Sequence, residues 1–367
     1  MPRYRRTLAG AFVAITSLFY IYWILRPEQI RVYRPPDDAL NSTLGFAHIL
    51  VLNLPSRPDR RAALSAAAAA TNLSLTWRDA QTGSQVPASS LPGLRSPGAR
   101  GSWASHMDAV TTVAGSGMGG SALIMEDDVD WDVRLRGQVS SFAGAARAWL
   151  DTPTTAGGKS ESIYGEGWDV LWLGHCGTDL PSSRIIARAD PSVPAPRHLK
   201  PHPFARGDAL GSAYAAHARV VHEARGTVCS LAYAVSARGA RRLARDFSPP
   251  LPRNKNNARK GFYQWDLMLR DWCEGGFSSE PGEEEGGEEQ EERGPKPVCL
   301  TVQPPLISHY FGAGGSNIRG LGGGYARGVT GSPYIRLSVR ANLERLMAGV
   351  PEEGLVDQLP DDGEALW

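Results

Sequence analysis

The segment ALIMEDDVDWD, residues 122–132, concentrates five carboxylates directly after a short apolar run. The acidic residues are Glu126, Asp127, Asp128, Asp130 and Asp132. Like charges this close repel one another and lower folding stability unless something positive lies among them. Mg²⁺ and Mn²⁺ accept oxygen ligands and commonly bridge a protein to substrate phosphates. The cluster therefore predicts a metal–diphosphate site, with a solvated acidic turn as the alternative.

A histidine near the C-terminus is a candidate partner for these carboxylates. His309 lies in PPLISHYFGAGGSNI, residues 304–318, and precedes the glycines Gly312, Gly314 and Gly315. A neutral imidazole is a good ligand for Mn²⁺, and glycines let backbone amides approach phosphate oxygens. Taken alone, however, a single histidine is more often a packed core residue.

The charge of the chain is unevenly distributed. The 367 residues carry a net charge of +1, yet nine glutamates and no basic residue lie between Glu274 and Glu292. Without those nine, 29 acidic residues face 39 basic ones, which is a charge of +10. A basic body suits an anionic ligand, and Arg57, Arg60 and Arg61 in NLPSRPDRR are candidates to meet a nucleotide. The chain has no basic run with interleaved aromatic residues, which argues against a nucleic-acid partner.

Short apolar runs alternate with stretches of helical pattern along the chain. The predicted strands are 47–54, 74–80, 121–125, 168–174, 230–235 and 298–303. The predicted helices begin at Pro58, at Ser102 or Ser105 with an end near Gly115, at Val133, after the cap Ser236, and at Gly261. This alternation predicts an α/β fold with a mostly parallel sheet covered by helices on both faces. Ligands of such sheets bind beyond the carboxyl ends of the strands, where residues 126–128 are expected to lie.

The N-terminal residues predict a membrane anchor. Thr7 to Leu25 is free of charge, and as a helix it would span about 28 Å, close to the thickness of the hydrocarbon core. No small-residue cleavage site follows, so a retained signal anchor is expected. Glycosylation sequons at Asn41 and Asn72 favour a lumenal body in type II orientation. We expect a single-pass protein of the Golgi or ER membrane, the choice between them being open.

The chain thus divides into parts of different composition. They are a cytoplasmic tail (1–6), a transmembrane anchor (7–25), a stem (26–44), a globular domain (45–348) and an acidic tail (349–367). A disordered acidic insert is expected at 276–297. The four cysteines contain no CxxC pair, which favours disulfides over zinc. A bridge from Cys273 to Cys299 across the insert is one of three possible connectivities.

Seven segments occur in a fixed order between residues 46 and 318. They are VLNLPSRPDRR, WASHMDAV, ALIMEDDVDWD, DVLWLG, AYAVSARGARRL, YQWDLMLRDWC and PPLISHYFGAGGSNI. No single segment is specific, but together they resemble glycosyltransferase family 25, the lipopolysaccharide-biosynthesis and procollagen galactosyltransferase-like group. The resemblance implies that 45–348 is a GT-A-type, Rossmann-like domain. It also implies transfer of a sugar from a nucleotide diphosphate donor, usually UDP-linked, with a divalent metal.

The same resemblance implies roles for individual residues. Asp128, His309 and Glu126 would bind Mn²⁺ or Mg²⁺, with the donor ribose as an alternative contact of Glu126. Glu126 and Asp128 are expected on the same side of an extended chain. Contacts to the nucleotide or the donor site are implied for Asn53, Leu54, Arg57, Ser105 and His106. Asp127 would contact the donor sugar or face away, and Asp266 is the candidate base if the reaction inverts the anomeric centre.

The expected activity is transfer of a hexose, galactose or glucose, from a UDP-sugar to a hydroxyl of a protein or glycan acceptor. A catalytically inactive relative that binds nucleotide sugars or glycans is the alternative, and the presence of Glu126, Asp128 and His309 counts against it. A metal-dependent phosphoesterase would need histidines and acids at several strand ends, and the eight histidines do not cluster in that way. Asn317 stands where the family often has aspartate, which leaves the donor sugar open.

Overall fold

The computed structural model describes most of the chain beyond residue 40. The described residues are 41–91, 94, 96–115, 120–151, 162–182, 184–199, 210–248, 264–276, 295–311 and 331–363. The predicted cytoplasmic tail, the anchor at 7–25, most of the stem, nearly all of the acidic insert and the glycine-rich segment after Phe311 lie outside them. Within the described residues, no helix combines the length and the apolar character needed to cross a membrane.

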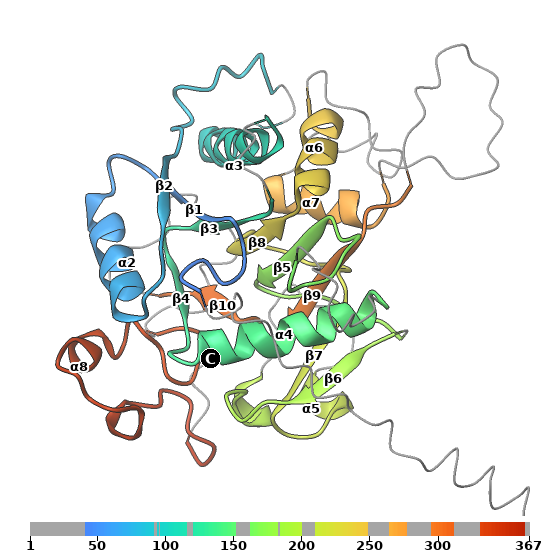
Figure 1. Ribbon diagram of the computed structural model, residues 1–367. Coiled ribbons are helices and arrows are strands. Elements are labelled where there is room, and N and C mark those ends of the chain that lie inside the picture. The colour runs from blue at the N-terminus through green and yellow to red at the C-terminus, as the bar shows by residue number, and fades with distance from the viewer. Residues whose placement is uncertain are drawn as a thin grey trace, which may run out of the picture. The chain divides into compact units, whose positions relative to one another are not determined.

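An eight-stranded mixed sheet forms the centre of the described fold, in the order β2-β1-β3-β8-β5-β9-β7-β6 (Figure 1). The strands are β1 (His48–Asn53), β2 (Thr76–Asp79), β3 (Ala122–Glu126), β5 (Val170–Gly174), β6 (Ile186–Ala189), β7 (Ala218–Glu223), β8 (Ala232–Val235) and β9 (Cys299–Gln303). β7 and β8 run opposite to the other strands of this sheet. The predicted α/β class with a mostly parallel sheet is confirmed. The reversal of β8 was not predicted, because an apolar run carries no information about strand direction.

Helices cover both faces of this sheet, as the alternating pattern predicted. They are α2 (Pro58–Ala70), α3 (Pro97–Gly115), α4 (Leu135–Trp149), α5 (Leu210–Ala213), α6 (Ala237–Asp246), α7 (Trp265–Cys273) and α8 (Leu343–Met347). Neighbouring residues of a strand point to opposite faces. Val51 of β1 accordingly belongs to the same core cluster as Leu64 of α2 and Phe142 of α4. Leu50 belongs to the cluster that contains Val110 of α3, and α6 and α7 complete this second face (Figure 1).

Two predicted helix starts can be compared with the structure. Ser236 caps α6 as predicted, because its Oγ accepts a hydrogen bond from Gly239 N at 2.9 Å. The prediction that α3 begins at Ser102 or Ser105 was wrong, since the helix begins at Pro97. Proline is favoured in the first turn of a helix, where its missing N–H costs nothing. Ser105 lies inside the helix, and its hydroxyl donates to Gly101 O at 2.7 Å.

The acidic segment continues into a second, two-stranded sheet that was not predicted. β4 (Val129–Trp131) pairs antiparallel with β10 (Ile307–His309), and His309 lies opposite Val129. Strands of three residues are too short to show a periodic pattern. Their pairing nevertheless decides the geometry described below, because it brings residues 307–309 beside the end of β3.

Two of the five clustered carboxylates have a structural role. Asp130 is fully buried and accepts hydrogen bonds from the hydroxyls of Ser332 and Ser338 at 2.6 and 2.5 Å. Asp132 is also fully buried and accepts from Arg134 Nε at 2.7 Å and from Leu337 N at 3.0 Å. Both carboxylates therefore fasten the C-terminal residues 331–342 to the domain.

The acidic tail predicted from residue 349 packs against the domain as far as residue 363. The side chain of Asn342 accepts from Val356 N at 2.7 Å and donates to Val356 O at 2.9 Å. Leu359 is fully buried. The hydrogen bonds to Asn342 and the burial of Leu359 thus attach this mostly polar tail to the domain.

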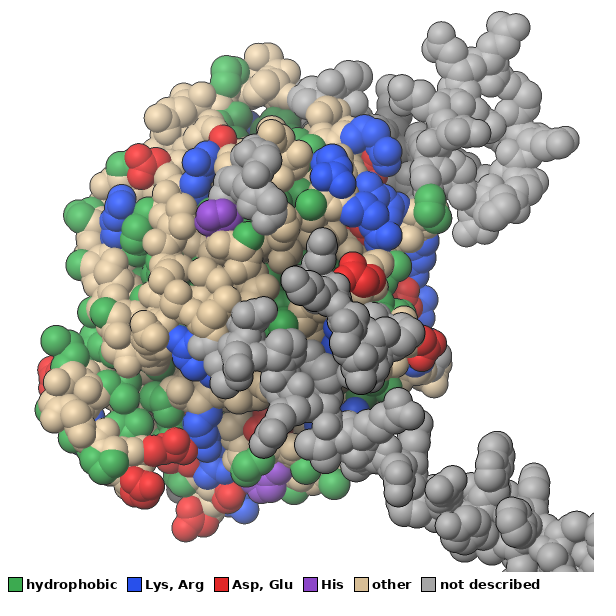
Figure 2. Space-filling model, viewed as in Figure 1, with side chains coloured by type: hydrophobic (Ala, Val, Ile, Leu, Met, Phe, Trp, Pro, Cys, Tyr) green, Lys and Arg blue, Asp and Glu red, His purple; other side chains and the backbone are tan. Residues whose placement is uncertain are grey.

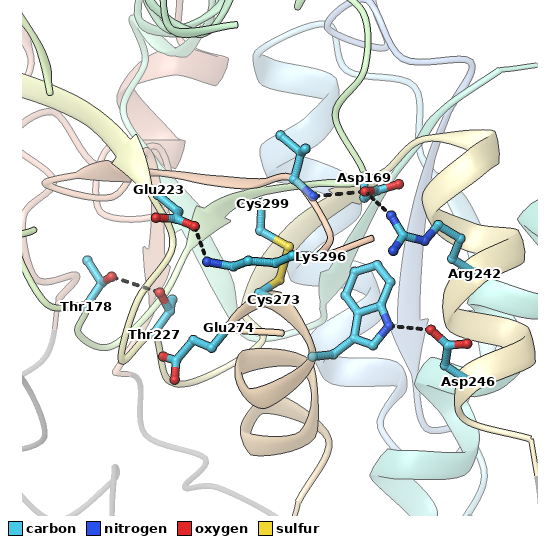
Figure 3. Close-up of a disulfide and its surroundings, with 12 residues drawn as sticks. Asp169, Thr178, Glu223, Thr227, Arg242, Asp246, Cys273, Glu274, Lys296 and Cys299 are labelled. Atoms are coloured by element: carbon cyan, nitrogen blue, oxygen red, sulfur yellow. Dashed lines mark hydrogen bonds and ion pairs between the residues drawn. A yellow bond between two sulfur atoms is a disulfide. The ribbon is translucent and has the colours of Figure 1, made fainter. Parts of the chain in front are cut away.

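The cysteines form two disulfides, Cys176–Cys229 and Cys273–Cys299. The second was one of the three connectivities considered, and the structure confirms it. It joins the end of α7 to the start of β9 (Figure 3). Around it, Lys296 pairs with Glu223 at 2.5 Å and Arg242 pairs with Asp169 at 2.8 Å. The base of the acidic insert is therefore held by one covalent bond and neighbouring ion pairs.

Basic side chains gather over α6 on the face seen in Figure 2. Arg238, Arg241 and Arg245 of this helix are exposed. Arg238 also bonds the buried Asp169 at 2.8 Å, so part of this charge is structural. The basic residues behind the positive charge of the body therefore do not all lie near the acidic strand end; several lie on α6.

Asp190 and Arg219 form a buried ion pair. Arg219 Nε donates to Asp190 Oδ2 at 2.5 Å, and Ser192 N donates to Asp190 Oδ1 at 2.9 Å. Burial by itself raises the pKa of Asp190, but Arg219 and Ser192 outweigh it, so the folded-state pKa lies below the usual value. The pair therefore stabilises the fold above the unfolded-state pKa of about 4. This contribution is lost as the pH falls through the folded-state pKa.

Replacing Asp190 with asparagine is expected to lower the free energy of unfolding by about 3 kcal/mol near neutral pH, because Arg219 would be left buried without its counter-ion. The difference from the wild type should begin to shrink as the pH falls below about 4, and it should disappear below the lower folded-state pKa, where the wild-type carboxylate also becomes neutral. Urea unfolding of both proteins over a series of pH values measures it. A difference that stays constant down to the acid limit would contradict this assignment.

Candidate functional site

The acidic strand end lies at a switch point in the order of the sheet. β1 is flanked by β2 on one side and by β3 on the other, and all three strands are parallel. Glu126 at the end of β3 pairs in register with Leu52, next to Asn53 at the end of β1. The connections that follow β1 and β2 run to opposite sides of β1, so the switch point lies at the carboxyl ends of β1 and β3. Open α/β sheets bind their ligands outside the strand ends at such a point.

Asp127 and Asp128 follow β3 at this switch point and share one arginine. Arg60 Nη1 donates to Asp127 Oδ1 at 2.7 Å and to Asp128 Oδ2 at 2.8 Å. Asn53 Nδ2 donates to Asp127 Oδ2 at 2.7 Å. Arg60 comes from the first turn of α2, whose start is set by Pro58. The positive group that the carboxylate cluster requires is therefore supplied, within the described residues, by Arg60.

His309 completes the surroundings of Asp128. Its Nε2 lies 3.3 Å from Asp128 Oδ2, and Tyr310 N donates to the backbone carbonyl of Asp128 at 2.8 Å. The other carboxylate oxygen of Asp128, Oδ1, is buried and has no hydrogen-bond partner in the structure as described. A buried carboxylate oxygen without a donor costs free energy. Its presence beside an imidazole indicates a position prepared for a ligand.

The titration of these groups reflects opposing effects of burial and charge. Burial and the neighbouring Asp128 raise the pKa of Asp127 despite Arg60 and Asn53. Burial also opposes ionisation of Asp128, but His309, Arg60 and Arg340 outweigh it and hold the pKa of Asp128 well below its usual range. Burial lowers and Asp128 raises the pKa of His309, with a net increase. Of these two carboxylates, Asp128 is therefore the one that loses its proton more readily.

Glu126 joins this pair to a second polar cluster on the neighbouring strand. Ser230 Oγ donates to Glu126 Oε1 at 3.0 Å, and His106 Nε2 lies 3.8 Å from the same oxygen. His106 Nδ1 and the Tyr233 hydroxyl are 3.1 Å apart. The imidazole stacks on Trp265, with 5.2 Å between ring centroids. Because His106 Nε2 also lies 3.3 Å from Ser230 Oγ, the ring is held by stacking on Trp265 and by hydrogen bonds at both nitrogens.

Asp266 lies close to this second cluster, at the start of α7. Its Oδ2 accepts a hydrogen bond from Cys229 N at 2.8 Å, and Cys229 is tied to Cys176 by a disulfide. Burial raises the pKa of Asp266, and the charge of Glu126 adds to the increase. A buried carboxylate with a raised pKa is suited to exchange a proton near neutral pH.

Three other predicted site residues have different surroundings. Ser105 accepts a hydrogen bond from Gln81 N at 2.8 Å and fastens α3 to the segment after β2. Leu54 accepts a backbone hydrogen bond from Arg57 N at 2.8 Å, which forms the turn into α2. Arg57 donates a side-chain hydrogen bond to Asp59, which raises the pKa of Arg57. The charges of Asp127 and Asp128 contribute to the same increase. Arg57 therefore lies close enough to Asp127 and Asp128 to feel their charge. The contacts described for Ser105 and Leu54 are with the backbone of neighbouring segments.

The predicted metal ligands are only partly brought together. Within the described residues, no group of three or more His, Cys, Asp and Glu side chains is arranged to hold a metal ion. Asp128 and His309 are adjacent, whereas Glu126 is hydrogen-bonded to Ser230. Oxygen from Asp128 Oδ1 and nitrogen from His309 are a donor set that Mn²⁺ accepts. Divalent cations at phosphate-binding sites take their remaining ligands from substrate oxygens and water, so a metal held by Asp128 and His309 stays a prediction.

Several groups at the site were not assigned from the sequence. Arg60 was named only as one of three arginines near a strand end, and the apolar rings of Tyr233 and Trp265 are typical of core residues. Ser230 carries no recognisable signal, because its role arises from the pairing of β8 with β3. Arg340 reaches the neighbourhood through the C-terminal segment, and its guanidinium lies over the ring of Tyr310 at 4.2 Å.

A scan against protein-family models finds no matching family, and a search of curated proteins finds no match. Support for a function therefore comes from the geometry above and from the motifs in the sequence.

Proposed function

We propose that this chain is a metal-dependent glycosyltransferase of the family 25 type, with a GT-A-type domain. The donor is a UDP-sugar, the transferred group is a hexose such as galactose or glucose, and the acceptor is a hydroxyl of a protein or glycan. The proposal includes an N-terminal signal anchor in the Golgi or ER membrane and a lumenal catalytic domain.

One observation carries the proposal. Asp128 stands at the carboxyl end of β3 with a lowered pKa, next to His309, and one of its buried oxygens accepts no hydrogen bond in the described structure. A carboxylate left in this state is costly unless a ligand completes it. A divalent cation would pair with the Asp128 carboxylate and with the phosphates of a nucleotide diphosphate. The ends of β1 and β3 are also where open α/β sheets bind their ligands.

Asp128 and His309 are the residues that would hold the cation. Bound there, Mn²⁺ or Mg²⁺ would neutralise the negative charge that develops on the diphosphate leaving group. Arg60 offers a further positive charge to the diphosphate while it keeps Asp127 in place. Asn53 donates to the second oxygen of Asp127 and so fixes the orientation of this carboxylate, which would contact a donor-sugar hydroxyl.

Asp266 is the group best suited to accept the acceptor's proton, provided that the reaction inverts the anomeric centre. Its raised pKa moves its protonation equilibrium toward neutral pH, where a general base is most effective. Glu126, Ser230 and His106 form one connected polar group, and the charge of Glu126 raises the pKa of both Asp266 and His309.

An inactive nucleotide-sugar-binding relative is the second candidate, and Arg60 is the observation in its favour. A guanidinium that bonds both Asp127 and Asp128 places a fixed positive charge where a cation is proposed. In such a protein, Arg60 would bind the diphosphate directly and no metal would be needed.

Release of UDP from a panel of UDP-sugars by the full chain in detergent tests the proposal. Turnover of one donor in Mn²⁺ that EDTA abolishes is the expected result, and it would also name the sugar. Donor binding without turnover, unchanged by EDTA and by added protein or glycan acceptors, would favour the inactive relative. Absence of both binding and turnover for every donor would overturn the proposal.

The two disulfides provide an internal comparison. Replacing both cysteines of either bridge with serine is expected to cost about 3–4 kcal/mol of stability, as for other loops of 26 and 53 residues. Only the Cys176/Cys229 replacement should also reduce turnover in the folded protein, because Cys229 N holds Asp266. UDP release measured well below the melting temperature, beside urea unfolding, separates the two effects. Equal activity of both variants would contradict the role given to Asp266.

A further inference from the structure

The two glycosylation sequons, 31 residues apart in the chain, are in contact in the fold. Ser42 belongs to the sequon of Asn41, and Ser74 is the last residue of the sequon of Asn72. Ser74 N donates to Ser42 O at 2.8 Å, and Ser74 Oγ donates to Ser42 Oγ at 2.8 Å. The turn before β1 and the turn after α2 therefore form one surface.

Arg136 at the start of α4 fixes this surface. Its guanidinium donates to the carbonyl oxygen of Asn41 at 2.5 Å and to those of Thr71 and Asn72 at 3.2 and 2.6 Å. One side chain thus holds both sequon backbones in position. The asparagines themselves are both exposed.

The hydrogen bonds described for the Asn41 side chain all use its amide oxygen. Asn41 Oδ1 accepts from Thr43 N at 3.0 Å, from Thr43 Oγ1 at 3.1 Å and from Gly45 N at 2.9 Å. An N-linked glycan is attached to the other amide atom, Nδ2. Asn72 is exposed and lies in a left-handed turn with φ of 53°, a conformation that asparagine tolerates well.

We infer that Asn41 and Asn72 are both N-glycosylated and carry neighbouring glycans on this surface. The inference rests on the lumenal location proposed above and is independent of the transferase activity. In the reaction, an Nδ2–H bond breaks and an Nδ2–C1 bond forms with the first sugar of a polyprenyl-diphosphate-linked oligosaccharide. The diphosphate leaves with the electron pair of its bond to C1, and the proton passes to a base of the transferring enzyme.

The glycans would stand away from the candidate site. Arg60 in the first turn of α2 contacts Asp128, and Asn72 follows the opposite end of the same helix. Ala70, the last residue of the helix, is ten residues after Arg60, which is about 15 Å along the axis. Loss of the glycans should therefore leave UDP release by the folded protein unchanged.

The test expresses the full chain in a eukaryotic secretory cell and compares its gel mobility before and after peptide N-glycosidase. Two steps of mobility are expected, and Asn41→Gln and Asn72→Gln should each remove one. Ser74→Ala should remove the same step as Asn72→Gln, whereas Ser74→Thr, which keeps the hydroxyl, should retain it. A wild-type chain whose mobility does not change would overturn the inference.

Ala88→Asn supplies the control for compartment. Ala88 lies in an exposed turn two residues before Ser90, so this single change creates a new acceptor triplet. If the new site is glycosylated and the natural ones are not, the sequon surface is rejected while the lumenal location stands. If no variant carries a glycan, the lumenal location fails and the inference fails with it. The transferase proposal is then still decided separately by UDP release.

Discussion

Asp128→Asn is expected to reduce Mn²⁺-dependent UDP release by at least about a hundredfold, the usual effect of removing one group that stabilises developing charge. Asparagine keeps the shape of the side chain but loses the charge that pairs with His309 and Arg60. It also replaces the unpartnered oxygen with a group that binds a cation poorly. Initial rates at saturating donor and several Mn²⁺ concentrations measure the effect.

Asp79→Asn is the matched control for this substitution. Asp79 also ends a strand of the sheet, β2, but its side chain is 73% exposed. The Asp79→Asn substitution should leave both the rate of UDP release and the free energy of unfolding unchanged. Wild-type activity in Asp128→Asn, in a protein with normal urea unfolding, would refute the role assigned to Asp128.

Asp130→Ala is expected to lower the free energy of unfolding by about 3 kcal/mol or more. The change removes the acceptor for two buried hydroxyls, and each buried donor left without a partner costs about 1–3 kcal/mol. Residues 331–342 should detach first, since Ser332 and Ser338 are their attachment points. Urea unfolding gives the energy, and limited proteolysis followed by mass spectrometry locates the first cut.

Asp108→Ala is a suitable comparison, because Asp108 makes an ion pair with Arg78 on the surface and is 46% exposed. Surface pairs contribute about 0–1 kcal/mol. If Asp130→Ala were no more destabilising than Asp108→Ala, the structural role assigned to Asp130 in the acidic segment would be wrong.

Much of the fold was predictable because it depends on local patterns. The run from 47 to 54 became β1, and the alanine-rich stretch after Pro58 became α2. Both are recognised from apolar content and from proline at a helix start. The direction of β8 and the short strands β4 and β10 depend on pairing between distant segments. No local pattern encodes such pairing.

The site was predictable only in part for the same reason. Asp128 and His309 could be named from residue type, and the β4–β10 pairing does bring them together. That Arg60 bridges Asp127 and Asp128 follows from the position of α2 against β3, which the sequence does not specify. Asp130 and Asp132 look like members of the same acidic cluster, yet Asp130 accepts from Arg340 N and Asp132 accepts from Leu337 N, both in the C-terminal segment.

The central claim is that Asp128 holds a divalent cation which in turn holds a nucleotide diphosphate. Electron paramagnetic resonance of Mn²⁺ titrated into the full chain, with and without UDP, tests it most directly. The account predicts that UDP strengthens Mn²⁺ binding in the wild type and in Asp79→Asn, and that Asp128→Asn weakens it at least about tenfold. Equal Mn²⁺ binding by all three proteins, or UDP binding that is indifferent to Mn²⁺, would contradict it.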